Sequence, residues 1–306
     1  MIDEVKGEEG DTKCGVVAVV GAPNAGKSTL VNALVGQKVA IVSPKVQTTR
    51  TRLMGIAMEN STQLMLVDTP GIFAPRRRLE RAMVAAAWEG AEGADAILLM
   101  VDARGGFKPE VEAIVERLAD RPEPKLLALN KVDISKKDKL LPLAERLNER
   151  VVFQETVMIS AATGDGVPYV KARLASMMPP GPWHYPEDQL SDVTTRLLAA
   201  EITREKLYLQ LHEELPYACT IETEKWEERK DGSVAIYQQI LVARETQKAI
   251  ILGKGGHQIK ALGEAARIDL AQQLDRRVHL FLHVKVKPDW ADDRGVYRDM
   301  GLGWVE

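Results

Sequence analysis

The apolar residues of the chain change their spacing along its length, and these changes predict where strands and helices lie. From Cys14 to about Met178, short apolar runs alternate with stretches in which apolar residues recur every three or four positions. Near-continuous apolar runs are typical of strands buried on both faces, as in a parallel sheet covered by helices. The predicted strands lie in 15–20, 63–68, 96–102, 125–130 and 151–160, and the predicted helices include 110–119 and 138–150. This alternation predicts a doubly wound α/β domain.

A proline-rich segment, MMPPGPWHYPEDQ, interrupts the alternation at 177–189. Because proline lacks a backbone donor and ends helices, we expect a linker here. The predicted division is a disordered acidic tail at 1–13, an α/β domain at 14–178, a linker at 179–190, a second domain at 191–290 and a C-terminal tail at 291–306.

The second domain is predicted to be smaller and of the α+β class. Ser191 is the expected N-cap of a long helix that ends before Pro216. Two alternating strands follow around the Asp231-Gly232 turn, which is a strong hairpin signal. Two helices then flank a glycine loop, and the apolar run at 278–286 is the expected last strand. The predicted order is α-β-β-α-α-β.

Composition narrows the class of protein. With 306 residues, of which 45% are hydrophobic, the chain can form two ordinary cores. The net charge of −3 excludes a polycation that coats nucleic acid by charge alone, so nucleic-acid contact requires a local patch. The two cysteines, Cys14 and Cys219, lack a metal-ligand spacing. Neither a signal peptide nor an apolar run of the ~20 residues that span a membrane is recognised. We therefore expect a protein of the reducing cytosol.

The segment GAPNAGKS at 21–28 fits the phosphate-binding pattern G-x-x-x-x-G-K-[ST] between a predicted strand and a helical stretch. In such loops backbone N–H groups converge on phosphate oxygens, the lysine reaches the β and γ phosphates, and the serine binds Mg²⁺. The alternative, a glycine-rich turn with an incidental lysine, is disfavoured by this context. The predicted nucleotide-binding residues are Gly21, Ala22, Pro23, Asn24, Ala25, Gly26, Lys27, Ser28 and Thr29.

A second segment, DTPG, follows a predicted strand and can complete the metal site. The carboxylate of Asp68 can hold Mg²⁺ through water, and the N–H of Gly71 can meet the γ-phosphate. Between the two motifs, the threonines of SPKVQTTRTR can close over the γ-phosphate. The alternatives are a polar turn and a solvated basic loop. The predicted metal ligands are Ser28, Thr49 and Asp68, and the nucleotide-binding residues of this segment are Asp68, Thr69, Pro70, Gly71 and Ile72.

A third motif, NKVD at 130–133, distinguishes guanine from adenine. A carboxylate at Asp133 can accept the N1 and exocyclic amino protons of guanine, and the stem of Lys131 can pack along the base. The alternative is a pair of helix-capping residues. Small residues at the end of the next predicted strand can offer a backbone N–H to guanine O6. The residues predicted for the base are Asn130, Lys131, Val132, Asp133, Ser160, Ala161 and Ala162.

The ordered set GAPNAGKS, QTTR, DTPG, NKVD and SAA resembles the GTPase domain of the translation-factor-related class, and within it the Era family of ribosome-assembly GTPases. The segments PEDQLSD, GKGG and DWADD extend this resemblance over nearly the whole chain. It implies hydrolysis of GTP to GDP with Mg²⁺, with Asn24, Lys27, Thr49 and Gly71 as the catalytic residues. Ile72 replaces the glutamine that orients water in small GTPases, so the water must be positioned by another group. Asn24 is predicted, as in similar proteins, to contact a K⁺ ion that acts where an arginine finger otherwise does.

The glycine loop at 253–256 lacks the Ser/Thr that a nucleotide loop needs after Gly-Lys. A G-x-x-G loop between two helices in this order of elements resembles the type II KH domain, which clamps about four single-stranded nucleotides. From Arg244 to Lys285, eight Lys/Arg stand against four Asp/Glu. The alternative is a helix–helix turn with glycine caps. The predicted RNA-binding residues are Ile251, Gly253, Lys254, Gly255, Gly256, His257 and Lys260.

These features together predict a GTP-controlled RNA-binding protein. The resemblance implies 16S ribosomal RNA near its 3′ end and the 30S subunit as partners, peripheral contact with the inner face of the membrane, and a monomer. Two alternatives remain at this point: a P-loop small-molecule kinase with an unrelated binding domain, and an RNA-binding adaptor that binds GTP without hydrolysis.

Overall fold

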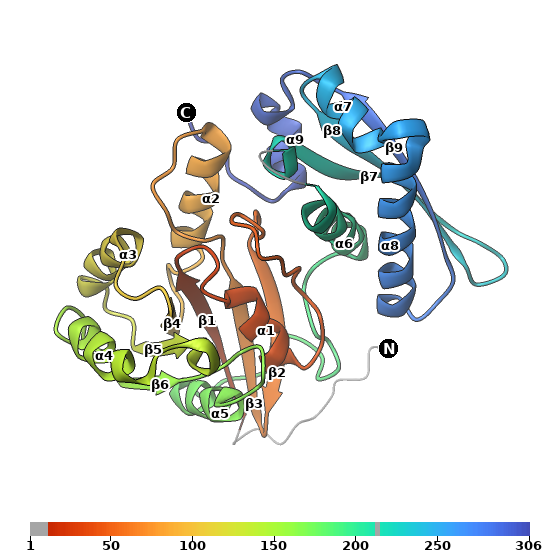
Figure 1. Cartoon of the computed structure of the whole chain (residues 1–306). Coiled ribbons are helices and arrows are strands. Elements are labelled where there is room, and N and C mark those ends of the chain that lie inside the picture. The colour runs from red at the N-terminus through yellow and green to blue at the C-terminus, as the bar shows by residue number, and fades with distance from the viewer. Residues whose placement is uncertain (1–11, 212–214) are drawn as a thin grey trace. The chain divides into compact units, whose positions relative to one another are not determined.

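The computed structural model describes residues 12–211 and 215–306 (Figure 1). Contacts between Cα atoms divide the chain into two compact units. The first unit comprises the chain up to Ala40, Thr49–Arg76 and Met83–Asp192, and the second comprises Ile41–Thr48, Arg77–Ala82 and Val193–Glu306. Two short segments from the first half of the chain are therefore grouped with the second half.

The first unit is built on a six-stranded sheet. Its order is β2-β3-β1-β4-β5-β6, and β2 is the antiparallel strand. The strands are β1 Lys13–Gly21, β2 Leu53–Glu59, β3 Thr62–Asp68, β4 Ala96–Asp102, β5 Lys125–Asn130 and β6 Glu155–Met158. The carboxyl ends of the parallel strands meet at one edge, where the polar motifs follow.

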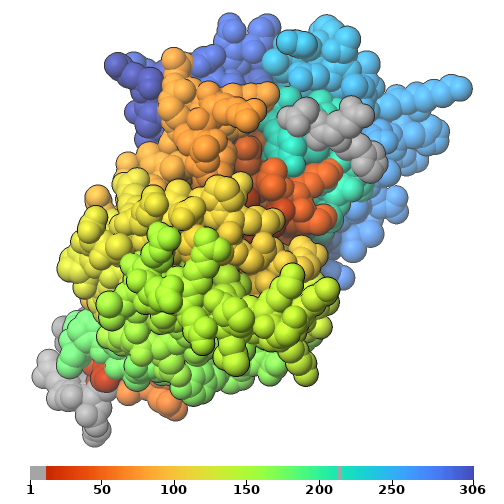
Figure 2. All heavy atoms as spheres, turned by 60° about the vertical axis from the view of Figure 1, so that its left-hand side comes forward, coloured from red at the N-terminus to blue at the C-terminus, as the bar shows by residue number. Residues whose placement is uncertain are grey.

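Helices cover both faces of this sheet, as the apolar runs predicted. Val17 and Val19 of β1 point to the face packed by α1 and α5, whereas Ala18 and Val20 point to the face packed by α2, α3 and α4. The helices are α1 Lys27–Val35, α2 Arg78–Glu89, α3 Pro109–Ala119, α4 Leu140–Asn148 and α5 Val167–Met177. In Figure 2 the yellow to yellow-green atoms, which include those of α3 and α4, form one continuous area of the surface. The predicted doubly wound fold is confirmed.

Two details of the predicted sheet are wrong. Strand β2 was not expected from the sequence; it pairs with β3 through a turn in which Asn60 has a left-handed φ of 52°. Asparagine tolerates this conformation better than most residues, so Asn60 is the sequence feature that indicates a turn between β2 and β3. The expected strand at 151–160 is reduced to Glu155–Met158.

The second unit has a three-stranded sheet with helices packed against it. Strands β7 and β8 are antiparallel, and β8 and β9 are parallel. The elements are α6 Thr195–Gln210, β7 Cys219–Glu228, β8 Val234–Val242, α7 Glu245–Leu252, α8 His257–Gln273, β9 Val278–Val286 and α9 Arg294–Asp299. Up to β9 this is the predicted α-β-β-α-α-β order. Its core joins α6 and α8 to the strands through residues such as Leu207 and Leu262.

Several end positions differ from the prediction. Helix α6 is capped by Thr194, whose side chain accepts from the Leu197 N–H, whereas the Ser191 hydroxyl donates to the Met54 carbonyl. The expected tail at 291–306 contains α9. The expected disordered tail at 1–13 lies mostly outside the described residues, and its last residue, Lys13, begins β1. None of the helices in the described parts of the chain is long and apolar enough to span a membrane.

Candidate nucleotide and RNA sites

The phosphate-binding motif forms the loop between β1 and α1. Helix α1 begins at Lys27, and its N-cap, Gly26, has a left-handed φ of 98°. The Lys27 ammonium donates to the carbonyl oxygens of Gly21 and Ala22, each at 3.1 Å. Burial lowers the pKa of Lys27 to about 8, although the carboxylate of Asp68 acts in the opposite direction. A buried ammonium at a helix N-terminus is electrostatically suited to an anion.

Three predicted metal ligands lie together beside this loop. The Ser28 hydroxyl donates to Oδ2 of Asp68 at 2.6 Å and lies 2.8 Å from the hydroxyl of Thr49, which is 3.2 Å from the same Oδ2. Oδ1 of Asp68 is buried and accepts no hydrogen bond from any described residue. Burial raises the pKa of Asp68, whereas the hydrogen bond from Ser28 and the nearby Lys27 lower it. A buried carboxylate oxygen without a donor, next to two hydroxyls, fits a hard cation such as Mg²⁺.

The DTPG segment lies against the phosphate loop. A Cβ atom at Gly71 would lie 2.8 Å from Pro23, so only glycine permits this approach. The next residue, Ile72, donates its N–H to the Gly21 carbonyl at 3.1 Å, and its side chain is buried in the core on the α2–α4 side of the sheet. The side chain at this position therefore does not orient a water molecule.

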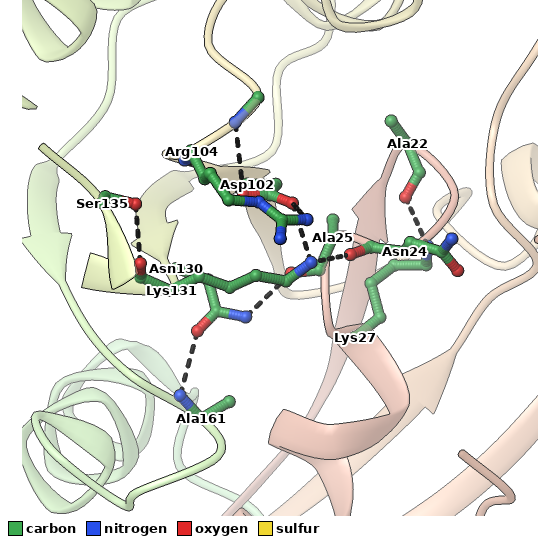
Figure 3. Close-up of polar contacts among 11 residues, drawn as sticks. Ala22, Asn24, Ala25, Lys27, Asp102, Arg104, Asn130, Lys131, Ser135 and Ala161 are labelled. Atoms are coloured by element: carbon green, nitrogen blue, oxygen red, sulfur yellow. Dashed lines mark hydrogen bonds and ion pairs between the residues drawn. The ribbon is translucent and has the colours of Figure 1, made fainter. Parts of the chain in front are cut away.

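The NKVD motif, at the end of β5, is hydrogen-bonded to the phosphate loop and to the SAA segment (Figure 3). The side chain of Asn130 donates to the Ala25 carbonyl at 2.8 Å and accepts from the Ala161 N–H at 2.9 Å. It therefore holds the phosphate loop and the SAA segment at fixed distances from β5. Asp133 is exposed, as a residue that binds a base from solvent must be.

Lys131 continues this network toward the phosphate loop. Its ammonium donates to the Asn24 carbonyl at 2.6 Å and to Oδ2 of Asp102 at 2.7 Å. Both Lys131 and Asn24 have left-handed φ values, 66° and 61°. Asp102 was not among the site residues predicted from the sequence. The available signal was its position at the end of a buried strand, opposite Asn130 in the register of β4 and β5.

The second glycine loop joins α7 to α8 in the second unit. Gly253, Gly255 and Gly256 all have left-handed φ values, of 69°, 62° and 77°. No atom lies within 4 Å of a Cβ placed at Gly256, and Lys254, His257 and Lys260 are exposed. The loop therefore presents an open backbone surface at Gly256, with the exposed side chains of Lys254, His257 and Lys260 beside it.

One predicted RNA contact is wrong. Ile251 is fully buried in the core of the second unit and has no surface for a base. Because successive residues of a helix point about 100° apart, the exposed apolar side chain is the preceding one, Ile250, which is 58% exposed.

The chain resembles known proteins over both units. A family model described as 50S ribosome-binding GTPase matches residues 16–131, and a KH domain model matches 214–291. GTPase Era of Erythrobacter litoralis is 62% identical and covers 96% of this chain and 98% of its own length. GTPase Era of Bradyrhizobium diazoefficiens is 56% identical, with coverage of 99% and 98%. A crystal structure of Era in complex with MgGDPNP and nucleotides 1506–1542 of 16S ribosomal RNA matches with a TM-score of 0.90 at 38% identity, covering 95% of this chain and 99% of that one.

Proposed function

The chain belongs to the Era family of GTPases, and we propose that it hydrolyses GTP to control its binding to 16S ribosomal RNA near the 3′ end during maturation of the 30S subunit. The observation that carries this proposal is the match, over 95% of the chain, to Era bound to both MgGDPNP and that RNA. The small-molecule kinase is set aside, because relatives named as GTPases match nearly the whole chain.

The residues of the first unit have distinct roles toward GTP. The amides of the phosphate loop and Lys27 bind the β and γ phosphates, and the Gly71 N–H meets the γ-phosphate. Ser28, Thr49 and Asp68 would hold Mg²⁺, which supplies positive charge against the charge that develops on the phosphates. Asp133 accepts the two N–H protons of guanine, Lys131 packs along the base, and a backbone N–H of the segment Ser160, Ala161 and Ala162 would lie near guanine O6.

Asn24 is the proposed contact of a K⁺ ion near the phosphates. Because Ile72 is buried in the core, its side chain does not position the attacking water. The K⁺ ion would supply the positive charge that an arginine finger supplies in other GTPases. Asn24 is exposed at the tip of the phosphate loop, and its left-handed backbone turns that tip toward Lys131. Equal turnover in Na⁺ and K⁺, or unchanged K⁺ stimulation in Asn24→Ala, would exclude this role.

The second unit is proposed to respond to the nucleotide through the Ile41–Thr48 segment, which belongs to this unit. Helix α6 binds both ends of that segment: Glu205 accepts from the Val42 N–H at 2.9 Å, and Arg204 donates to the Thr48 carbonyl at 2.5 Å. The next residue in the chain is Thr49, a proposed Mg²⁺ ligand. A shift of Thr49 on GTP hydrolysis therefore pulls on a segment that α6 holds.

The C-terminal residues bind a second such segment, Arg77–Ala82, which also belongs to the second unit. Arg78 pairs with Asp292 and lies over the Trp304 ring at 4.7 Å, and Arg81 donates to the main-chain oxygen of Glu306 at 3.3 Å. This segment follows DTPG in sequence. Ile41–Thr48 and Arg77–Ala82 therefore connect the proposed contacts of Mg²⁺ and the γ-phosphate, Thr49 and Gly71, to the unit that carries the RNA loop.

RNA is proposed to bind the loop from Gly253 to Gly256, with Lys254, His257 and Lys260 beside it.

The proposed division of the chain remains a GTPase domain at 14–178, a linker at 179–190 and a type II KH domain at 191–290. We propose that the protein is a monomer of the cytoplasm and touches the inner face of the membrane peripherally. Flotation of the purified protein with anionic and neutral vesicles tests the last point.

The function is tested by crosslinking the purified protein to 16S ribosomal RNA with a GTP analogue and with GDP. Crosslinks mapped to Lys254 and His257 that increase with one nucleotide support the proposal. Crosslinks elsewhere, or equal yields with both nucleotides, contradict it. Single-turnover hydrolysis of GTP above background excludes the non-hydrolysing adaptor.

A further inference from the structure

Asp102 ends β4 at the edge of the sheet where the nucleotide motifs meet, and its carboxylate has two separate sets of partners (Figure 3). Oδ1 accepts the N–H groups of Arg104 and Gly105 at 3.0 and 3.3 Å. Oδ2 accepts the ammonium of Lys131 at 2.7 Å. One oxygen therefore caps the turn after β4, and the other faces the NKVD motif.

The ion pair between Asp102 and Lys131 is partly shielded from solvent. The two side chains are 21% and 23% exposed, whereas the guanidinium of Arg104, 3.5 Å from the same oxygen, belongs to a side chain that is 60% exposed. Charged hydrogen bonds are stronger where water is partly excluded. Lys131 is therefore the principal partner of Oδ2.

The second hydrogen bond of the same ammonium reaches the phosphate loop, at the Asn24 carbonyl. Lysine has a long side chain whose freedom is costly to restrict. Two acceptors at 2.6 and 2.7 Å, one of them charged, hold the ammonium and so define the path of the stem. Without the carboxylate, a neutral carbonyl alone would oppose the release of the ammonium to water.

We propose that Asp102 is a positioning residue for guanine-nucleotide binding: it holds the Lys131 ammonium so that the lysine stem lies along the base and the Asn24 end of the phosphate loop stays in place. Asp102, Lys131 and Asn24 all lie in the first unit. Because GDP and GTP share the guanine base, the loss of affinity is expected with both nucleotides. The inference rests on the proposed role of Lys131 at guanine.

A purely structural role for Asp102 is the competing explanation, since Oδ1 already caps a turn. Asp102→Asn separates the two roles. The amide oxygen still accepts from the N–H groups of Arg104 and Gly105, but the other half of the side chain becomes an uncharged donor that faces the Lys131 ammonium. Asp120→Asn is the matched control, because Asp120 is an exposed aspartate at the end of α3 and its change alters the net charge equally.

The experiment measures the affinities for GDP and for a GTP analogue, and steady-state GTP hydrolysis, in the full-length protein. For Asp102→Asn we expect both affinities to fall about tenfold, the size of one charge-assisted hydrogen bond, with KM rising more than kcat falls. Asp120→Asn should bind like the parent protein. Unchanged affinity in Asp102→Asn, or a loss confined to kcat, overturns the proposal.

A double-mutant cycle with Lys131→Ala tests whether Asp102 acts through the lysine. The double variant should bind GDP no more weakly than Lys131→Ala alone, whereas additive losses overturn the proposal. If Asp102→Asn melts too low to assay, Asp102→Glu retains the charge and must bind GDP more tightly than the double variant. A parent protein that does not prefer GDP to ADP would instead refute the guanine site itself, so the two failures are distinguishable.

Discussion

The guanidinium of Arg204, on α6, donates a hydrogen bond of 2.5 Å to the main-chain carbonyl of Thr48. Arg204 is 2% exposed and also pairs with the buried carboxylate of Glu201. Burial by itself lowers the pKa of Arg204, but the Glu201 carboxylate raises it above its ordinary value. The arginine therefore remains charged and joins a carboxylate on its own helix to a segment more than 150 positions earlier in the chain.

Removal of one partner of this pair should destabilise the second unit strongly. In Arg204→Ala, the Glu201 carboxylate stays buried without its counter-ion, which costs about 3–5 kcal/mol. Urea unfolding followed by circular dichroism measures the loss. The double variant Arg204→Met with Glu201→Leu should recover most of the stability, because an apolar pair of similar volume replaces the charges. A double variant as unstable as Arg204→Ala would show that the charged pair is itself required.

The Thr49 hydroxyl should matter for hydrolysis, because it lies with Ser28 and Asp68 in the proposed Mg²⁺ site. Thr49→Val removes the hydroxyl at nearly constant volume, and we expect single-turnover hydrolysis of GTP to slow about 100-fold. Thr48→Val is the matched control, because that hydroxyl bonds only to Ser43 and to the Lys45 carbonyl in the hydrogen bonds of the described residues. Equal slowing in the two variants would argue against a metal role for Thr49.

Nucleotide binding should take up a proton above the pKa of Lys27, which is about 8 against an ordinary value of 10.5. The sign follows from the lowered pKa: the folded protein without nucleotide holds the lysine neutral between these values, whereas phosphate favours the charged form. Calorimetry with GDP in two buffers of different ionisation enthalpy, at a pH just above 8, measures the uptake. None is expected from Lys27 near pH 6.5, where it is already protonated. Uptake that does not increase from pH 6.5 to pH 8.5 would contradict the assignment.

Lys254 should contribute to RNA binding through phosphate. In Lys254→Ala we expect weaker binding to every single-stranded RNA sequence and a reduction of the salt slope by about 1, as one phosphate contact implies. Lys230→Ala, in the exposed turn between β7 and β8, is the charge-matched control and should bind RNA like the parent. Filter binding at several salt concentrations measures both variants. A uniform loss in the two variants would indicate a nonspecific charge effect.

The sequence by itself determined the family, most of the proposed nucleotide site, the strands of the first unit other than β2, and the order of elements in the second unit up to β9. The phosphate loop needs only a strand, glycines and a helix that are contiguous in the chain, so its pattern is local. Asp68 and Asn130 end parallel strands, and such strand ends converge at one edge of a sheet whatever its detailed packing. The sequence therefore predicted that distant motifs would meet.

Tertiary structure alone decided the antiparallel pairing of β2, the burial of Ile251, the partner of Asp102 and the grouping of Ile41–Thr48 with the second unit. The sequence carries at most a local hint of these features, such as Asn60 in the turn before β3 or the strand-end position of Asp102, because each feature depends on which surface another part of the chain covers. The spacing of apolar residues shows which side chains can be buried. A polar residue at the end of a strand can bind a ligand or another side chain. The partner of each is selected by long-range packing, where the hydrophobic and charged contacts of remote segments compete.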